Sequence, residues 1–411
     1  MQAEADEREL RKRAEAAINK KAAMGEDIDL DDYRLGERNL ERLQSLSQLN
    51  EEERKTLLQA GILPNEEGRA GSFLLMDESV VHVSSKNEGL EIMALSEAMK
   101  AHDWLKEYYW KAVPPDTDKF TARTFLDEAD GYFIRALPGV KITAPIQACL
   151  MLKEGKQKAQ TVHNIVIVEE GAELDVVTGC STSKGVEKSL HLGISEFYLK
   201  RGSKLTFTMI HNWSEEIGVR PRTVIIQEEG STFINNYVAL KPVRTIQTYP
   251  TAHLEGRNCF ARFNSVAIAH KGGELDLGSR AILSGEGCRC EMVSRTIATG
   301  GKVIARGQMV GKAKNARGHL ECRGLILGEG GIQIAIPELE AYVPDLEMTH
   351  EAAVGKIAQD QVEYLMARGL SEEEAVGIIV RGFLEVGIRG LPENLKREID
   401  KTMEKTDMRG L

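Results

Sequence analysis

Short segments of alternating polar and apolar residues fill the middle of the chain, from about residue 120 to residue 343. They include the runs HNIVIV, AELDVV, TVIIQ and STFINNYVAL, which alternate or are rich in β-branched residues, and each ends in a turn that contains glycine. Alternation with period two, bounded by turn residues, is typical of β-strands. Long helical patterns are missing from this stretch, so the sequence predicts a mainly β region.

The turns of this region recur. One series of glycines is spaced by 31, 28, 26 and 31 residues: Gly171, Gly202, Gly230, Gly256 and Gly287. A second series is spaced by 28 and 29 residues: Gly273, Gly301 and Gly330. Strands and tight turns that repeat at a period of about 28 residues are typical of a stacked β-helix, in which each coil buries its inner residues against the next coil. The alternative is a β-sandwich in which the glycine spacing is coincidental.

The first 119 residues are predicted to form a mostly helical region. Asn50 followed by Glu51 to Glu53 is a helix-capping signal, and Gly61 stands where that helix would stop. A second helical stretch runs from about Ser96 to Val113, where two prolines follow. Between the two helices, FLLMDESVVHVS predicts an early pair of strands.

Helical patterns return after residue 345, which gives three predicted regions: 1–119, a β-helix core at 120–345, and 346–411. The run IAQDQVEYLMARG ends at Gly369, and Ser371 with Glu374 forms a capping box. One face of the second helix is apolar and consists of Ala375, Ile378, Ile379 and Phe383. These helices either pack on the β core or present a groove for a partner. The sequence alone favours packing.

The net charge and the hydrophobic pattern disfavour several classes of function. The 411 residues carry a formal net charge of −10, which disfavours nucleic acid as a main ligand. No run approaches the roughly 20 apolar residues that cross a bilayer, and the polar N-terminus MQAEADEREL does not look like a secretory signal. We therefore expect a cytoplasmic protein that does not act on membranes.

The six cysteines form no CxxC pair, which excludes zinc-ribbon and ferredoxin-type motifs. A GxxxxGK[ST] motif is absent as well, so any ATP hydrolysis would come from a partner. We expect an assembly or scaffold protein without enzymatic turnover. A secreted β-helix polysaccharide lyase or hydrolase is the enzymatic alternative, and the lack of a secretion signal counts against it.

Four segments carry a resemblance to a known family. The stretch from Glu338 to Glu385, ELEAYVPDLEMTHEAAVGKIAQDQVEYLMARGLSEEEAVGIIVRGFLE, closely resembles the C-terminal signature shared by SufB and SufD. Upstream, NARGHLECRGLILGEGG, IVEEGAELDVVTGCST and MIHNWS are similar to three further elements of these proteins. The resemblance to the SufB/SufD (SufBD) family of iron–sulfur cluster assembly scaffolds spans residues 120 to 390.

This resemblance implies a right-handed parallel β-helix between helical terminal regions. It also implies a dimer, either a homodimer or a pair with a SufB/SufD paralogue, and a SufC-type ABC ATPase bound by the C-terminal helices. Sulfur would come from a cysteine desulfurase or another sulfur donor. A transient iron–sulfur cluster would form near the dimer interface and pass to carrier or apo-target proteins. The alternative within the family is a SufD-like accessory subunit that supports iron entry and ATPase binding without holding a cluster.

The resemblance also nominates site residues. Cys322 matches the cysteine proposed to hold the nascent cluster, and thiolates are the ligands that iron–sulfur units prefer. His350 and Glu351 match a His-Glu pair that we expect at a strand-to-helix junction, where both would complete the metal site. Adjacent strand residues point to opposite faces, so both reach one site only if the turn is irregular; otherwise one of them is structural. Because this chain holds both Cys322 and His350, a homodimer is the expected assembly.

A fourth candidate, Cys180, matches the position proposed to accept sulfur, although a cysteine that only packs a turn is nearly as good an interpretation. Cys288 and Cys290 would face one side of a strand, so a metal pair is conceivable there, but packing is expected. His319 should face away from Cys322 if its strand is regular. His211 departs from the glutamine expected in SufB, which weakens a purely SufB-like sulfur path.

Overall fold

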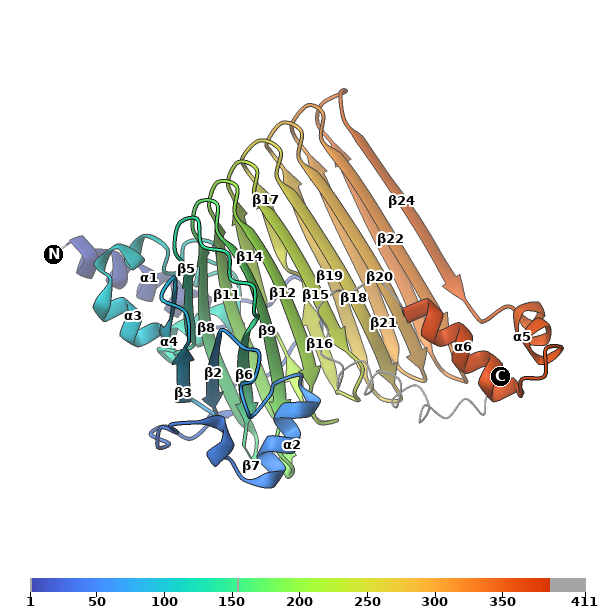
Figure 1. The fold of residues 1–411 in the computed structure, drawn as a ribbon, viewed down its shortest axis with the longest axis horizontal. Helices are drawn as coiled ribbons and strands as arrows, with labels where there is room; N and C mark the ends of the chain where they lie inside the picture. The colour runs from blue at the N-terminus through green and yellow to red at the C-terminus, as the bar shows by residue number, and fades with distance from the viewer. Residues whose placement is uncertain (1, 154, 385–411) are drawn as a thin grey trace.

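The computed structural model describes residues 2–153 and 155–384 and forms a parallel β-solenoid of about eight coils, flanked by helices (Figure 1). Two long sheets make the opposite walls of the solenoid, one of ten strands and one of twelve. All strand pairs are parallel except β2–β3 and β4–β5, which lie at the N-terminal end. The predicted mainly β fold with a solenoid core is confirmed, and the sandwich alternative is wrong.

The ten-stranded sheet follows chain order with only its first two strands exchanged. Its members are β2 (Gly71–Met76), β3 (Ser79–Ser85), β6 (Ile146–Leu152), β9 (Glu173–Thr182), β12 (Lys204–Asn212), β15 (Thr232–Ala239), β18 (Phe260–His270), β20 (Arg289–Thr299), β22 (Arg317–Ile326) and β24 (Glu347–Gly355). Each of the later strands therefore lies one coil beyond the strand that precedes it in this order.

The twelve-stranded sheet forms the other wall. Its members are β1 (Arg34–Leu35), β4 (Leu90–Ala94), β5 (Tyr132–Ala136), β8 (Lys158–Val168), β11 (Leu190–Leu199), β13 (Gly218–Val219), β14 (Arg222–Gln227), β16 (Thr245–Thr248), β17 (Thr251–Leu254), β19 (Glu274–Leu283), β21 (Lys302–Gly311) and β23 (Ile332–Ala341). A separate small pair joins β7 (Gly155–Lys156) and β10 (Val186–Glu187).

A single apolar cluster fills the interior between the walls, from Ala70 to Cys322. Gly202 and Gly230 turn the chain with φ angles of +62° and +68° and stack on one another in successive coils. Such positive φ angles suit glycine because it lacks a Cβ atom. The predicted turn at Gly301 is shifted by one residue, since the positive φ of +93° belongs to Gly300.

The N-terminal region contains less helix than predicted. Its helices are α1 (Gln2–Ala17), α2 (Glu51–Gln59), α3 (Leu95–Ala101), α4 (Lys119–Leu126) and the 3₁₀ turns η1 (Leu46–Gln48) and η2 (Asp103–Glu107). The capping box at Asn50 and the strand pair β2–β3 are confirmed. The single helix predicted up to Val113 is wrong, because backbone amides of Trp110, Ala112 and Val113 donate to the buried Glu196 carboxylate instead of to helical carbonyls.

Two C-terminal helices, α5 (Gln359–Met366) and α6 (Glu372–Leu384), follow β24. The capping box at Ser371 is confirmed, with the Ser371 amide donating to Glu374 at 2.8 Å. Helix α6 buries Ala375 and Val380 in a cluster on the outer face of the ten-stranded sheet, whereas Ile378, predicted on the apolar face, is 41% exposed. The packed interpretation therefore holds for this part, and residues 385–411 of the predicted partner-binding region lie outside the described residues.

Candidate functional site

Cys322 faces the interior of the solenoid from β22. Side chains alternate along this strand, with Leu320 and Cys322 buried in the interior cluster and Arg323 exposed on the outer face. The thiol is only 3% exposed, and burial, reinforced by the neighbouring Glu321 charge, raises its pKa to about 11. It is therefore protonated at neutral pH, and binding a metal there would release a proton.

His350 and Glu351 lie inside β24, so the prediction that they stand at a strand-to-helix junction is wrong. The strand continues to Gly355 because it pairs in unbroken register with β22. His350 is paired with the buried Leu320 and so belongs to the same face as Cys322, whereas Glu351 is paired with Glu321 on the outer face. His350 is nevertheless exposed, because β24 is the last strand of its sheet in the described chain.

Glu351 belongs instead to a ladder of charges on the outer surface. Its carboxylate accepts a hydrogen bond of 2.8 Å from Arg323, whose Nε also contacts Glu321 at 2.8 Å. Arg295 reaches Glu321 from the preceding coil at 2.7 Å. The structure therefore brings Cys322 and His350 to one face and separates Glu351 from both.

His319, which is also on β22, faces outward as predicted. Its Nδ1 lies 2.9 Å from Thr349 Oγ1, and its side chain is exposed. Across residues 2–153 and 155–384, no three His, Cys, Asp or Glu side chains gather closely enough to hold a metal ion. Within one copy of the described chain, Cys322 and His350 are thus an incomplete ligand set.

Cys180 lies deep in the interior on β9, and its register partner on β12 is His211. Burial raises the pKa of the Cys180 thiol well above its usual value, so the residue is neither exposed nor ionised. Burial also lowers the pKa of His211 to about 3, so that imidazole is neutral, with its Nδ1 2.9 Å from the Tyr237 hydroxyl. Five strand spacings of about 4.8 Å each separate β9 from β22, or about 24 Å, so Cys180 and Cys322 are not in contact.

A pair of neighbouring thiols was missed by the sequence analysis. Cys288 and Cys290 were both expected to pack in the core, and both are buried. Cys288 also makes a polar contact, because its Sγ lies 3.1 Å from the Gly256 carbonyl oxygen. Cys259 Sγ contacts that same oxygen at 3.2 Å. A hydrogen bond from Cys288 lowers the pKa of Cys259 to about 7 and raises that of Cys288. Their separation of 29 residues, one coil, was the signal available in the sequence.

Comparison with known proteins identifies the family to which the chain belongs. The family model of the SUF system FeS cluster assembly SufBD core domain matches residues 151–383. An iron–sulfur cluster assembly SufBD family protein of Archaeoglobus fulgidus is 51% identical over 352 residues, covering 86% of this chain and 94% of that protein. The chain belongs to the SufBD family.

Two further SufBD relatives match along most of their length. A SufBD family protein of Methanothermobacter thermautotrophicus is 46% identical over 405 residues, covering 97% of this chain and 98% of its own. The iron–sulfur cluster assembly protein SufB of Bacillus subtilis is 30% identical over 377 residues, covering 89% of this chain and 80% of its own. Within the described residues, no helix of this SufBD protein is both long and apolar enough to cross a membrane.

Proposed function

We propose that this SufBD protein is a scaffold on which a nascent iron–sulfur cluster is held by Cys322 and His350. The observation that carries the proposal is their placement on one face of two neighbouring strands, at the end of the solenoid where β24 leaves that face open. A thiolate and an imidazole are suitable ligands for iron–sulfur units. One cysteine, which would lose its proton on binding the metal, and one histidine leave the site open, which suits a cluster that must later be released.

The open end also supports a dimer that completes the site. Strands β23 and β24 are the final members of their sheets in the described chain, so their outer edges offer unpaired backbone groups to another sheet. Large apolar side chains are exposed on these strands, among them Ile332 and Val354. A second copy placed there would bring its own cysteine and histidine, which is why we propose a homodimer; a SufB/SufD paralogue is the other partner.

Glu351 takes a secondary place in this proposal. Its carboxylate is held on the outer face by Arg323, so it would join a cluster only after β24 changes its register, which would also break that ion pair. Sulfur delivered by a cysteine desulfurase or another donor would be accepted at Cys180. Since that thiol is buried and protonated, acceptance requires an opening of the solenoid wall and loss of the thiol proton.

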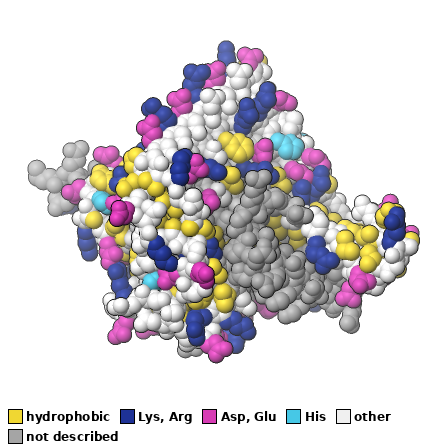
Figure 2. All heavy atoms as spheres, viewed as in Figure 1, with side chains coloured by type: hydrophobic (Ala, Val, Ile, Leu, Met, Phe, Trp, Pro, Cys, Tyr) yellow, Lys and Arg dark blue, Asp and Glu magenta, His cyan; other side chains and the backbone are white. Residues whose placement is uncertain are grey.

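The C-terminal helices are the proposed docking site of a SufC-type ABC ATPase. They present exposed apolar side chains beside charged ones, with Tyr364, Met366 and Ile378 each at least 41% exposed, and these helices lie at one side of the molecule (Figure 2). Energy for assembly would come from that partner, and the finished cluster would pass to carrier or apo-target proteins. In this proposal the chain itself performs no turnover.

The deciding experiment is anaerobic reconstitution with iron and sulfide, followed by visible absorption and bound-iron measurement. We expect the wild type to hold a chromophore and Cys322→Ser to lose it. His350→Ala should retain less iron than the wild type, and Glu351→Gln should retain most of it. The matched control is Cys290→Ser, which removes another buried, inward-facing thiol and should leave the cluster in place.

Two outcomes would contradict the proposal. If neither the wild type nor any variant holds a cluster, the SufD-like accessory role takes its place, with ATPase binding as its remaining activity. If Cys290→Ser removes the chromophore as completely as Cys322→Ser, the ligand assignment is wrong. Crosslinking with mass measurement tests the assembly, because detection of monomer alone rejects the homodimer.

A further inference from the structure

Neighbouring coils place opposite charges side by side along the outer walls of the solenoid. Lys302 on β21 lies 3.2 Å from Glu274 on β19, and Arg262 on β18 lies 3.4 Å from Glu291 on β20. Where two carboxylates meet, as at Glu321 and Glu351, an arginine bridges them. Cross-strand pairs of opposite charge stabilise a sheet, and like charges directly opposite destabilise it.

Arg289 and Arg317 break this rule. They are register partners on β20 and β22, one coil apart, and both are exposed on the outer face. In the part of the chain that the structure describes, the Arg289 guanidinium has no ion pair or hydrogen bond, and only its backbone amide donates, to the Cys259 carbonyl. The nearest carboxylate to Arg317 is Glu347 at 4.0 Å, an exposed pair that contributes little. Arg289 and Arg317 are thus two neighbouring cations without a bridging residue of opposite charge, unlike the carboxylates Glu321 and Glu351, which Arg323 bridges.

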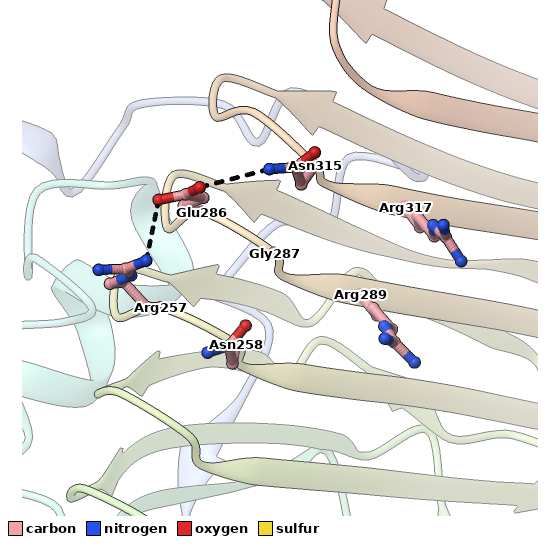
Figure 3. Close-up of a pocket in the computed structure, with 7 residues that line it drawn as sticks. All are labelled: Arg257, Asn258, Glu286, Gly287, Arg289, Asn315 and Arg317. Carbon is pink, nitrogen blue, oxygen red and sulfur yellow. Dashed lines mark hydrogen bonds and ion pairs between the residues drawn. The ribbon is translucent and has the colours of Figure 1, made fainter.

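The two arginines border a hollow of about 260 Å³ at the solenoid corner (Figure 3). Its lining consists of Arg257, Asn258, Glu286, Gly287, Arg289, Asn315 and Arg317. Glu286 is the one acidic residue of that lining, and it is already engaged by Arg257 at 3.1 Å and by the Asn315 amide at 3.3 Å. Arg289 and Arg317 extend side by side in the same direction, away from Glu286, so neither guanidinium group is paired with the acidic residue of the lining (Figure 3).

We propose that this hollow is a binding site for a small tetrahedral oxyanion of the phosphate or sulfate class, held between Arg289 and Arg317. Guanidinium groups form paired, charge-assisted hydrogen bonds with such anions. The hollow is smaller than the range of about 300–1,000 Å³ that suits drug-sized ligands, which favours a small ion over a large one. The anion is either free or the terminal phosphate of a larger molecule. The site is independent of the proposed cluster function, because it lies on the outer face and Cys322 faces inward.

The test is a phosphate titration of the full chain by calorimetry, together with thermal unfolding in phosphate and in chloride at equal ionic strength. We expect saturable phosphate binding and a higher melting temperature in phosphate. Arg289→Gln should weaken binding by about tenfold or more, since a hydrogen bond between charged groups contributes at least that factor. Without phosphate, Arg289→Gln should melt no lower than the wild type, because the substitution removes a repulsion between arginines.

The matched control is Arg201→Gln. Arg201 is 68% exposed at a turn of an earlier coil, and its nearest carboxylate is also 4.0 Å away, so it reproduces the exposure and weak pairing of Arg317. The control should bind phosphate as the wild type does. Equal stabilisation by chloride and phosphate, or unchanged affinity in Arg289→Gln, would overturn the proposal. Displacement of phosphate by ADP would assign the site to a terminal phosphate, and failure of ADP to compete would assign it to the free ion.

Discussion

The two ends of the solenoid are built in opposite ways. At the N-terminal end, antiparallel strands β3 and β4 close the sheets, and helices and loops from the first 130 residues cover the outer faces of the early coils. At the C-terminal end, β23 and β24 have no strand beyond them in the described chain, and none of their residues is fully buried. The covered end contributes stability, and the open end holds the residues proposed to bind a cluster.

A buried contact between a histidine and a glutamate anchors the covered end. His163 Nε2 on β8 lies 2.7 Å from Glu196 on β11, and both side chains are fully buried. The Glu196 carboxylate also accepts the backbone amides of the loop at Trp110, which fixes that loop onto the twelve-stranded sheet. No comparable buried pair is found in the described part of β23 and β24. The contrast implies that substitutions at the two ends should affect different properties.

The largest expected effect is at the covered end. Glu196→Gln should lower the free energy of unfolding by about 3 kcal/mol or more, because several backbone amides that donate to this buried carboxylate would lose their acceptor. An amide NH₂ group would also face the backbone donors that now point at the carboxylate. Urea unfolding followed by circular dichroism measures the loss. Glu170→Gln, a substitution of an exposed glutamate, is the control, and equal midpoints for the two variants would contradict the assignment.

A smaller effect should depend on pH. Burial raises the pKa of Glu78, in the β2–β3 turn, to about 8, although Thr161 of β8 donates to its carboxylate. The folded state therefore keeps a proton that the unfolded state loses above its lower, ordinary pKa. Stability should fall by about 2 kcal/mol as the pH rises from about 6 to about 8. Glu78→Gln should flatten this dependence in urea titrations at several pH values, and an unchanged slope would rule Glu78 out as its source.

The smallest effect on stability is expected at the open end. His350→Ala in the iron-free protein should change the free energy of unfolding by less than about 0.5 kcal/mol, because an exposed side chain without a buried partner contributes little. The same variant should nevertheless lose iron in reconstitution, as proposed above. Thermal unfolding of the apoprotein provides the measurement. A loss of unfolding free energy as large as that of Glu196→Gln would contradict the proposed difference between the two ends.

Local signals in the sequence predicted the repeated parts of the fold and failed where distant segments meet. The glycine turns at Gly202 and Gly230 and the capping boxes are local, so residue type and spacing were sufficient to find them. Strand alternation also predicted that His319 and Cys322 point to opposite faces. The extent of β24 depended on pairing with β22, which a single sequence does not display, and this placed His350 inside a strand.

The contacts of Glu196 were beyond prediction for the same reason. Its carboxylate connects β8, β11 and a loop some 85 residues upstream, and no local sequence pattern indicates that these segments are in contact. For the candidate site, the resemblance nominated Cys322 and His350, and the structure adds that they share a face. The thiol pair Cys259 and Cys288 was visible as a one-coil spacing once the period was known.

The stacking of coils fixes distances along the solenoid in multiples of one strand spacing. Cys180 and Cys322 are separated by a whole number of strand spacings, so their distance is set by how many coils lie between them and by little else. Removing one complete coil would shorten that distance by about 4.8 Å while leaving the strand around each cysteine intact. Evolution can therefore adjust the distance between Cys180, the proposed sulfur acceptor, and the open end in discrete steps, without redesigning either.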